Sequence, residues 1–132
     1  MPVSIQQAMA MVRAVHVHAI SLNIAVTATV VDEAGRIVAL GRMDKARPMT
    51  LEIAADKGFT AVNFQQPTRE LSPLAGESWF HSLSIATQGK VTAGGGAVPI
   101  VDGDRILGAV SAAGGTEEQE EQCCQVALKT RT

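Results

Sequence analysis

Three histidines, His16, His18 and His81, are the side chains in this 132-residue sequence best suited to ligate a metal. His16 and His18 stand two positions apart in a segment whose apolar residues recur every three or four positions, as in an α-helix. Because a separation of two residues places side chains about 200° apart on a helix, this pair cannot chelate one ion. His16 shares its side of the helix with Val12 and Ala19, which favours a core or interface position. His18 lies on the other side, free to face solvent, a neighbouring subunit or a ligand.

His81 follows two large aromatic residues, Trp79 and Phe80. An imidazole beside apolar rings would suit a haem pocket, because haem is a flat apolar plate whose iron needs one good ligand. The alternative is a surface histidine on an irregular segment. The sequence leaves both interpretations open.

The two cysteines, Cys123 and Cys124, are neighbours in the sequence. Adjacent cysteines have poor geometry for an ordinary structural disulfide. A structural zinc site is not expected either, because two thiols without Cys-x-x-Cys spacing supply too few ligands. We therefore predict buried thiols.

Two glycine-rich segments, Gly94-Gly95-Gly96 and Gly114-Gly115, are typical of places where backbone amides approach a ligand unobstructed. Thr116 follows the second segment and opens a predicted helix, whose N-terminal dipole favours an anion. With Arg42 and Lys57 adding positive charge, this set would bind a carboxylate, either of a small acid or of a haem propionate. Tight turns and ordinary helix capping account for the same glycines equally well.

The elements that position these residues follow from hydrophobic periodicity and turn residues. We predict strands over 24–31, 36–43, 97–101 and 105–111, and helices over 4–21, 48–64, about 79–85 and from 116 onward. Turn residues at 32–35 and 102–104 join the strands into two hairpins. The fold class is therefore α+β, an antiparallel β-sheet of two hairpins flanked by helices. Repeated βαβ units are absent, which argues against a Rossmann architecture.

The helices differ in the surfaces that they present. In the second helix Ile53 and Phe64 point away from a stripe of small residues, and this second apolar face needs a cover. A partner subunit is the expected cover, and a local loop is the alternative. The acidic run 117–121 is interpreted as a solvated face. The predicted core stripe of the first helix comprises Ile5, Ala8, Met9, Val12, Val15, Ala19 and Ile20.

Composition bounds the class of protein. Hydrophobic residues make up 46% of the sequence and charged residues 18%, as in a single globular domain over 1–132. A net charge of −2 argues against nucleic-acid binding, and no apolar run approaches the roughly 20 residues of a membrane helix. Because the N-terminus lacks the basic and apolar blocks of a signal peptide, we expect a cytoplasmic protein.

An ordered set of segments over about 24–127 matches the pattern of one family. The segments are Val30-Val31-Asp32-Glu33-Ala34-Gly35, Arg42-Met43-Asp44-Lys45-Ala46, Ala54-Ala55-Asp56-Lys57-Gly58-Phe59-Thr60-Ala61, Pro67-Thr68, Gly94-Gly95-Gly96-Ala97-Val98-Pro99-Ile100, Ile106-Leu107-Gly108-Ala109-Val110 and Gly114-Gly115-Thr116. Together they resemble the GlcG/HbpS family, which includes the C-terminal domain of PduO-type proteins. Three departures from the family pattern are Gly58 for a common alanine, Glu120 for aspartate and Cys123 for alanine.

The resemblance implies a homo-oligomer, often an octamer, associated with haem, and it makes His18 and His81 candidate iron ligands. Our first hypothesis is accordingly a haem- or tetrapyrrole-associated binding protein. The second is an enzyme or accessory protein in the catabolism of a small carboxylic or hydroxylated compound, which would be held by the glycine segments, Arg42 and Lys57. No Ser-His-Asp motif, P-loop or zinc signature decides whether the protein is an enzyme.

Overall fold

The computed structural model describes residues 2–131, which form four strands and six helical segments. In chain order these are α1 (Ile5–Ser21), β1 (Thr27–Asp32), β2 (Ile37–Arg42), α2 (Thr50–Phe64), η1 (Thr68–Leu74), α3 (Ser78–Ala86), β3 (Ala97–Asp102), β4 (Arg105–Ala113), α4 (Glu117–Leu128) and η2 (Lys129–Arg131).

The strands form one antiparallel sheet in the order β2-β1-β4-β3. Each predicted hairpin is present, and the two are joined through β1 and β4, where Thr29 lies opposite Ser111. The predicted α+β class is confirmed. β1 is buried along almost its whole length, as expected for a strand covered on both faces.

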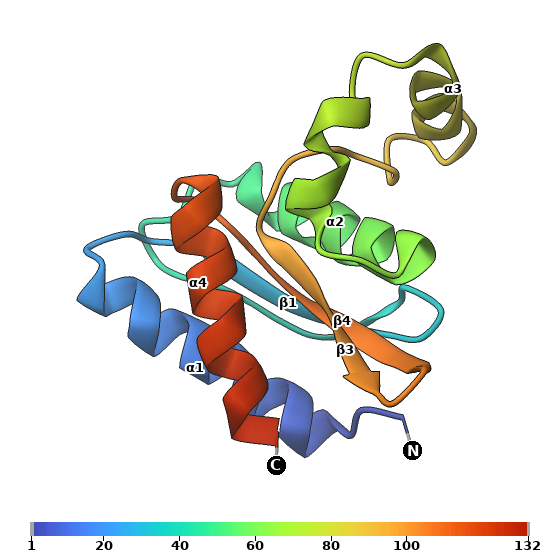
Figure 1. The fold of residues 1–132 in the computed structure, drawn as a ribbon. Helices are drawn as coiled ribbons and strands as arrows, with labels where there is room; N and C mark the ends of the chain where they lie inside the picture. Colours follow the sequence, from blue (N-terminus) through green and yellow to red (C-terminus); the bar gives the residue numbers. More distant parts are fainter. Residues whose placement is uncertain (1, 132) are drawn as a thin grey trace.

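Helices cover the two faces of the sheet unequally (Figure 1). α1 and α4 pack against each other across one face, and α2 lies on the other. The larger core lies under α1 and α4, and a smaller one lies under α2, where Ala61 and Val62 meet Val31, Ala97 and Ala109. A Cβ on Gly58 would lie 3.2 Å from a methyl group of Val31, so the glycine permits the close approach of α2 to the sheet.

The face of α1 that packs is narrower than the predicted stripe. Its buried residues are Ala8, Met11, Val15 and Ala19, whereas Ile5, Met9 and Ile20 of the predicted stripe are exposed. The prediction missed Met11 because spacing alone does not show where a helix centres its contact face. The predicted start is confirmed: Ser4 caps α1 and accepts a hydrogen bond from the Gln7 backbone N–H at 3.1 Å.

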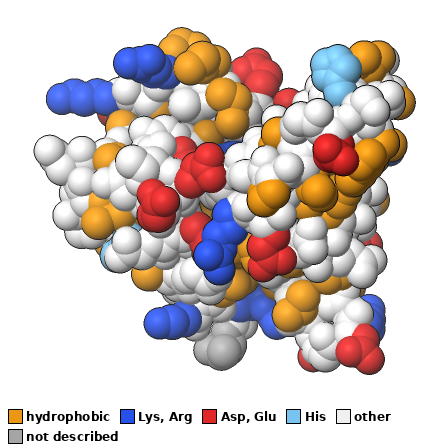
Figure 2. Space-filling view, turned by 45° about the horizontal axis from the view of Figure 1, so that its top comes forward, with side chains coloured by type: hydrophobic (Ala, Val, Ile, Leu, Met, Phe, Trp, Pro, Cys, Tyr) orange, Lys and Arg blue, Asp and Glu red, His pale blue; other side chains and the backbone are white. Residues whose placement is uncertain are grey.

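Residues 67–93 form an arm that projects from the sheet and carries α3 (Figure 1). Its small core contains Leu71, Phe80 and Val91, and Phe64 packs against that core from the end of α2. Figure 2 shows hydrophobic side chains along this arm, and three large ones are substantially exposed: Trp79, Leu83 and Ile85. Within residues 2–131, no helix combines the length and the hydropathy needed to cross a membrane.

Candidate functional site

Lys57 of α2 is the most deeply buried cation described, with 4% of its side chain exposed. Its ammonium Nζ donates hydrogen bonds to the carbonyl oxygens of Gly95 at 2.9 Å and Ala112 at 2.7 Å, and to Glu120 Oε1 at 2.8 Å. All three ammonium protons thus have acceptors, which offsets the cost of removing the charge from water. Lys57 links α2 to the turn before β3, to β4 and to α4.

Glu120 completes this buried network from the first turns of α4. Its second oxygen, Oε2, accepts hydrogen bonds from the backbone N–H groups of Gly114 at 2.7 Å and Gly115 at 3.0 Å. The interpretation of 117–121 as a solvated face is therefore wrong for Glu120. The helical spacing of the sequence could have shown this, because position 120 lies on the same helix face as 123, 124 and 127. All four residues are buried in the structure.

The structure thus brings together Lys57 and both glycine segments, with the chain's own carboxylates on their amides. Glu117 Oε1 accepts a hydrogen bond from the Gly95 N–H at 2.9 Å, as Glu120 does from the Gly114 turn. Gly96 has φ +118°, and a side chain there would collide with Lys57 and Glu120. Thr116 caps α4 and forms a capping box with Gln119.

A pocket of about 430 Å³ opens on the outer side of the Gly114-Gly115 turn. Its cationic residues are Lys45 and Arg47 from the loop before α2; both are exposed and were missed as site residues in the sequence. Arg42 ends β2, is exposed, and is absent from the lining of this pocket. The remaining lining residues are Ala25, Met49, Thr50, Ile53, Ala113 and Glu120.

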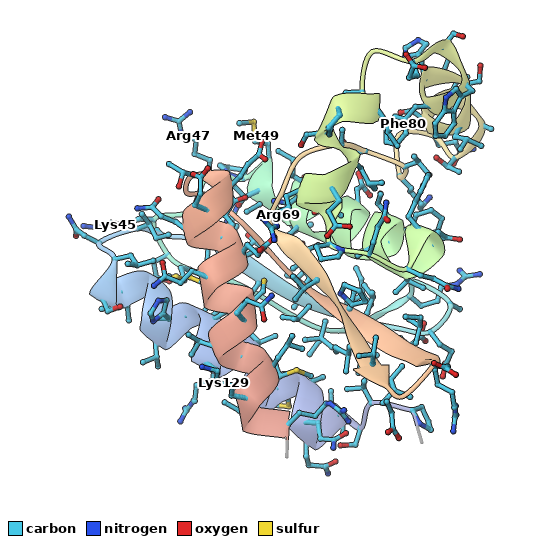
Figure 3. The ribbon with its side chains drawn as sticks, in the orientation of Figure 1. Lys45, Arg47, Met49, Arg69, Phe80 and Lys129 are labelled. Carbon is cyan, nitrogen blue, oxygen red and sulfur yellow. The ribbon has the colours of Figure 1, made fainter. Side chains whose placement is uncertain are left out.

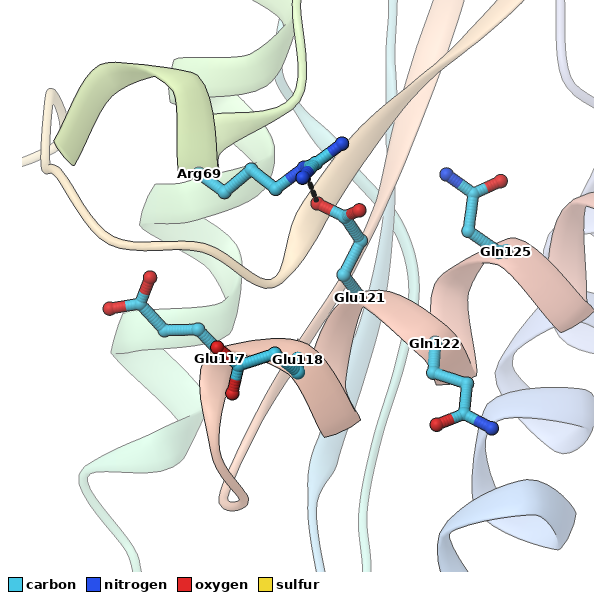
Figure 4. A pocket seen from close by; sticks show the side chains of 6 residues that line it. All are labelled: Arg69, Glu117, Glu118, Glu121, Gln122 and Gln125. Atoms are coloured by element: carbon cyan, nitrogen blue, oxygen red, sulfur yellow. Dashed lines mark ion pairs between the residues drawn. The ribbon is translucent and has the colours of Figure 1, made fainter.

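A second pocket, of about 330 Å³, lies on the outer face of α4 beneath the arm (Figure 4). Arg69 reaches across it, and its Nε lies 3.0 Å from Glu121 Oε1. Because Arg69 is 63% exposed, this ion pair contributes little to stability. Glutamates and glutamines form the rest of the lining: Glu117, Glu118, Gln122 and Gln125.

The three histidines lie in different surroundings. His16 Nε2 lies 2.8 Å from the carbonyl oxygen of Gly41 on β2, and because a carbonyl only accepts, that nitrogen carries the proton. His18 is half-buried, and its Nε2 is buried without a hydrogen-bond partner among the residues that the structure describes. His81 is exposed on α3. No single site unites His18 with His81 in the described chain, since one lies on α1 and the other on the arm.

Cys123 and Cys124 are free, buried thiols, as the sequence predicts. Burial, and then the charge of Glu120, raise the pKa of Cys123 to about 11, and burial raises that of Cys124 further. Cys124 Sγ lies 3.4 Å from the carbonyl oxygen of Gly96, so this thiol also contacts the glycine segment. Residues 2–131 contain no cluster of three or more histidine, cysteine or acidic side chains arranged for a metal ion.

Comparison with known proteins decides the family. The model of the haem-degrading HbpS-like proteins matches residues 3–129. The chain belongs to the HbpS-like family. A relative, the 15.0 kDa protein of the dhaT-dhaS intergenic region of Citrobacter freundii, is 30% identical over 128 residues; these cover 96% of this chain and 89% of the relative.

Two further similar proteins carry the name PduO. The corrinoid adenosyltransferase PduO of Citrobacter freundii is 30% identical over 129 residues, which cover 97% of this chain but 38% of the enzyme. The chain thus spans well under half of that adenosyltransferase. The crystal structure of a PduOC–haem complex superimposes with a TM-score of 0.89 at 28% identity, covering 98% of this chain and 94% of that one.

Proposed function

We propose that this HbpS-like chain binds haem or a related tetrapyrrole as a homo-oligomer. The PduOC–haem complex supports the ligand class, because it shares the fold at 28% identity. The observation in this chain that carries the proposal is the buried, unpartnered Nε2 of His18. A buried polar atom without a hydrogen bond is costly, and ligation of iron is one way to satisfy an imidazole nitrogen.

The residues present fit such a group. The His18 ring is half-buried, so part of it lies at the surface, and rotation about its side-chain bonds would turn the nitrogen outward. His16 is the poorer candidate because its Nε2 already donates to Gly41. His81 is the second candidate, since its exposed ring lies on a helix with exposed Trp79 and Ile85. A bound haem would supply a redox-active iron held by an imidazole.

Haem titration of the purified chain, followed at the Soret band, tests this proposal. We expect a saturable shift in the wild type, its loss in His18→Ala, and its retention in His81→Ala, which removes an equal imidazole elsewhere. Circular dichroism of each variant checks that it remains folded. The absence of a saturable shift in the wild type would overturn haem binding. A shift lost only in His81→Ala would keep haem binding and overturn the choice of His18.

Self-association is supported by the arm. Trp79 and Ile85 on α3 are 47% and 67% exposed, although both are large and apolar. Exposed apolar groups of this kind mark interaction surfaces, and a second copy of the chain is the cover that we propose. The octamer implied by the family resemblance is the assembly that we propose.

Sedimentation velocity tests the assembly at micromolar concentration. We expect an oligomer in the wild type, a smaller species in Trp79→Ser/Ile85→Ser, and no change in Ser82→Ala, a substitution of an exposed polar residue on the same helix. A monomeric wild type would contradict the proposal. We also propose a cytoplasmic setting, in which free thiols such as Cys123 and Cys124 stay reduced.

A further inference from the structure

We infer that the pocket formed by Lys45, Arg47, the start of α2 and the Gly114-Gly115 turn binds the carboxylate of a short aliphatic acid. We call it the carboxylate pocket. Neither proposed iron ligand lines this pocket, so the inference goes beyond the proposed haem function.

The carboxylate pocket has an excess of positive charge. Lys45 and Arg47 are exposed, and neither side chain has an acidic partner among residues 2–131. Figure 3 shows both extending from the loop at the end of the molecule where α2 and α4 begin. Glu120 also lines the pocket, but its charge is balanced by Lys57 and both of its oxygens are engaged. The pocket therefore attracts an anion.

Two helices begin at the carboxylate pocket. The turn before α4 contributes Gly114 and Gly115, and the start of α2 contributes Met49 and Thr50. The N-terminal end of a helix carries partial positive charge. Side chains of the chain itself serve the α4 end, through the Thr116 cap and Glu120, whereas the N-cap of α2, Met49, makes no side-chain cap hydrogen bond. The start of α2 therefore lacks a side-chain N-cap, although Glu52 stands in its first turn.

The size and the apolar walls of the carboxylate pocket indicate the kind of ligand that would fit it. A volume of about 430 Å³ lies toward the small end of the range for ligand pockets, and the walls include the apolar side chains of Ala25, Met49, Ile53 and Ala113. Cations at the rim and apolar walls suit a carboxylate on a short hydrocarbon segment. A free short-chain acid and a haem propionate share this chemistry, so the experiment must separate the two sources.

Binding of propionate and succinate to the whole chain is measured by amide chemical-shift titration. We expect saturable shifts at Thr50, Gly114 and Gly115 in the wild type. In Lys45→Gln/Arg47→Gln we expect affinity to fall about tenfold or more, because charge-assisted hydrogen bonds are lost. The matched control Arg36→Gln/Arg105→Gln removes two exposed arginines that follow the two hairpin turns and should bind like the wild type.

A second arm compares haem with its dimethyl ester on the wild type and on Lys45→Gln/Arg47→Gln. The pocket is assigned to the haem propionates if two results are found together. The ester binds more weakly than haem to the wild type but not to the double variant, and the free acids show no saturable binding. Saturable binding of the free acids assigns it to small acids, whether or not haem binds. The inference is overturned if neither source of carboxylate depends on Lys45 and Arg47, even when haem binding itself succeeds.

Discussion

Lys57, on one side of the Gly114-Gly115 turn, and Lys45 with Arg47, on the other, differ in burial and in their polar partners. Lys57 is buried on the inner side and has three acceptors within 2.9 Å. Lys45 and Arg47 lie on the outer side, exposed and without acidic partners in the described chain. A buried cation with a full set of acceptors holds the fold together, whereas exposed cations beside a pocket are available to a ligand.

Among the substitutions that test this difference, Lys57→Met should cause the largest loss in the free energy of unfolding. The substitution leaves Glu120 as a buried charge without a counter-ion, at a cost of about 3–5 kcal/mol in the free energy of unfolding. Urea unfolding followed by circular dichroism measures the loss. Lys90→Met removes an exposed lysine elsewhere and serves as the control. A loss below about 1 kcal/mol would show that the buried pair is not structural.

A substitution in the Gly114-Gly115 turn should cause the next largest loss of stability. Gly114 has φ +139°, and an added Cβ would overlap the carbonyl oxygen of Ala25, so Gly114→Ala should destabilise the chain by about 1–3 kcal/mol or more. Gly76 has open space around its Cα, and Gly76→Ala should be neutral or slightly stabilising. Thermal unfolding of the two alanine variants measures the difference. Equal midpoints would contradict the strain assigned to Gly114.

The outer cations should contribute almost nothing to stability. We expect Lys45→Gln/Arg47→Gln to change the free energy of unfolding by less than about 0.5 kcal/mol, because neither side chain has an acidic partner in the described chain. The same urea titration used for Lys57 gives a direct comparison. A loss close to that of Lys57→Met would remove the distinction between the two groups.

The smallest effect should come from Asp56, the neighbour of Lys57 on α2. Burial raises the pKa of this carboxyl, Lys90 opposes the rise and Glu52 adds to it. A raised pKa means that the folded state binds more protons than the unfolded state between the two pKa values. Stability therefore falls as pH rises through that acidic window and is level above it. Unfolding midpoints against pH should fall less in Asp56→Asn, and parallel curves for the two proteins would contradict this account.

Local signals predicted the elements well. Ser4 and Thr116 cap α1 and α4 as expected, because a cap and its partner lie three residues apart. The two hairpins follow from turn residues at 32–35 and 102–104, which lie between strands that pair locally. The helix predicted near 79–85 is α3, which spans Ser78–Ala86.

The candidate site was harder to predict. Lys57 was chosen for its charge, but its partners Gly95, Ala112 and Glu120 lie 38, 55 and 63 positions away. No local pattern pairs residues at such separations. Lys45 and Arg47 were missed for the same reason, since they become site residues only where the loop before α2 meets the turn before α4.

Cap spacing, turn chemistry and hydrophobic periodicity were enough to determine the α+β class and its two hairpins, because these depend on residues a few positions apart. The family resemblance rests on a separate observation, the ordered set of matching segments. Tertiary packing alone decided which charges are used internally and which remain available. The glycine amides and Lys57, suited to bind an external anion, instead hold Glu117 and Glu120, because folding brings those carboxylates to them. Lys45 and Arg47 line the pocket beside the Gly114-Gly115 turn and have no such internal acidic partner in the described chain.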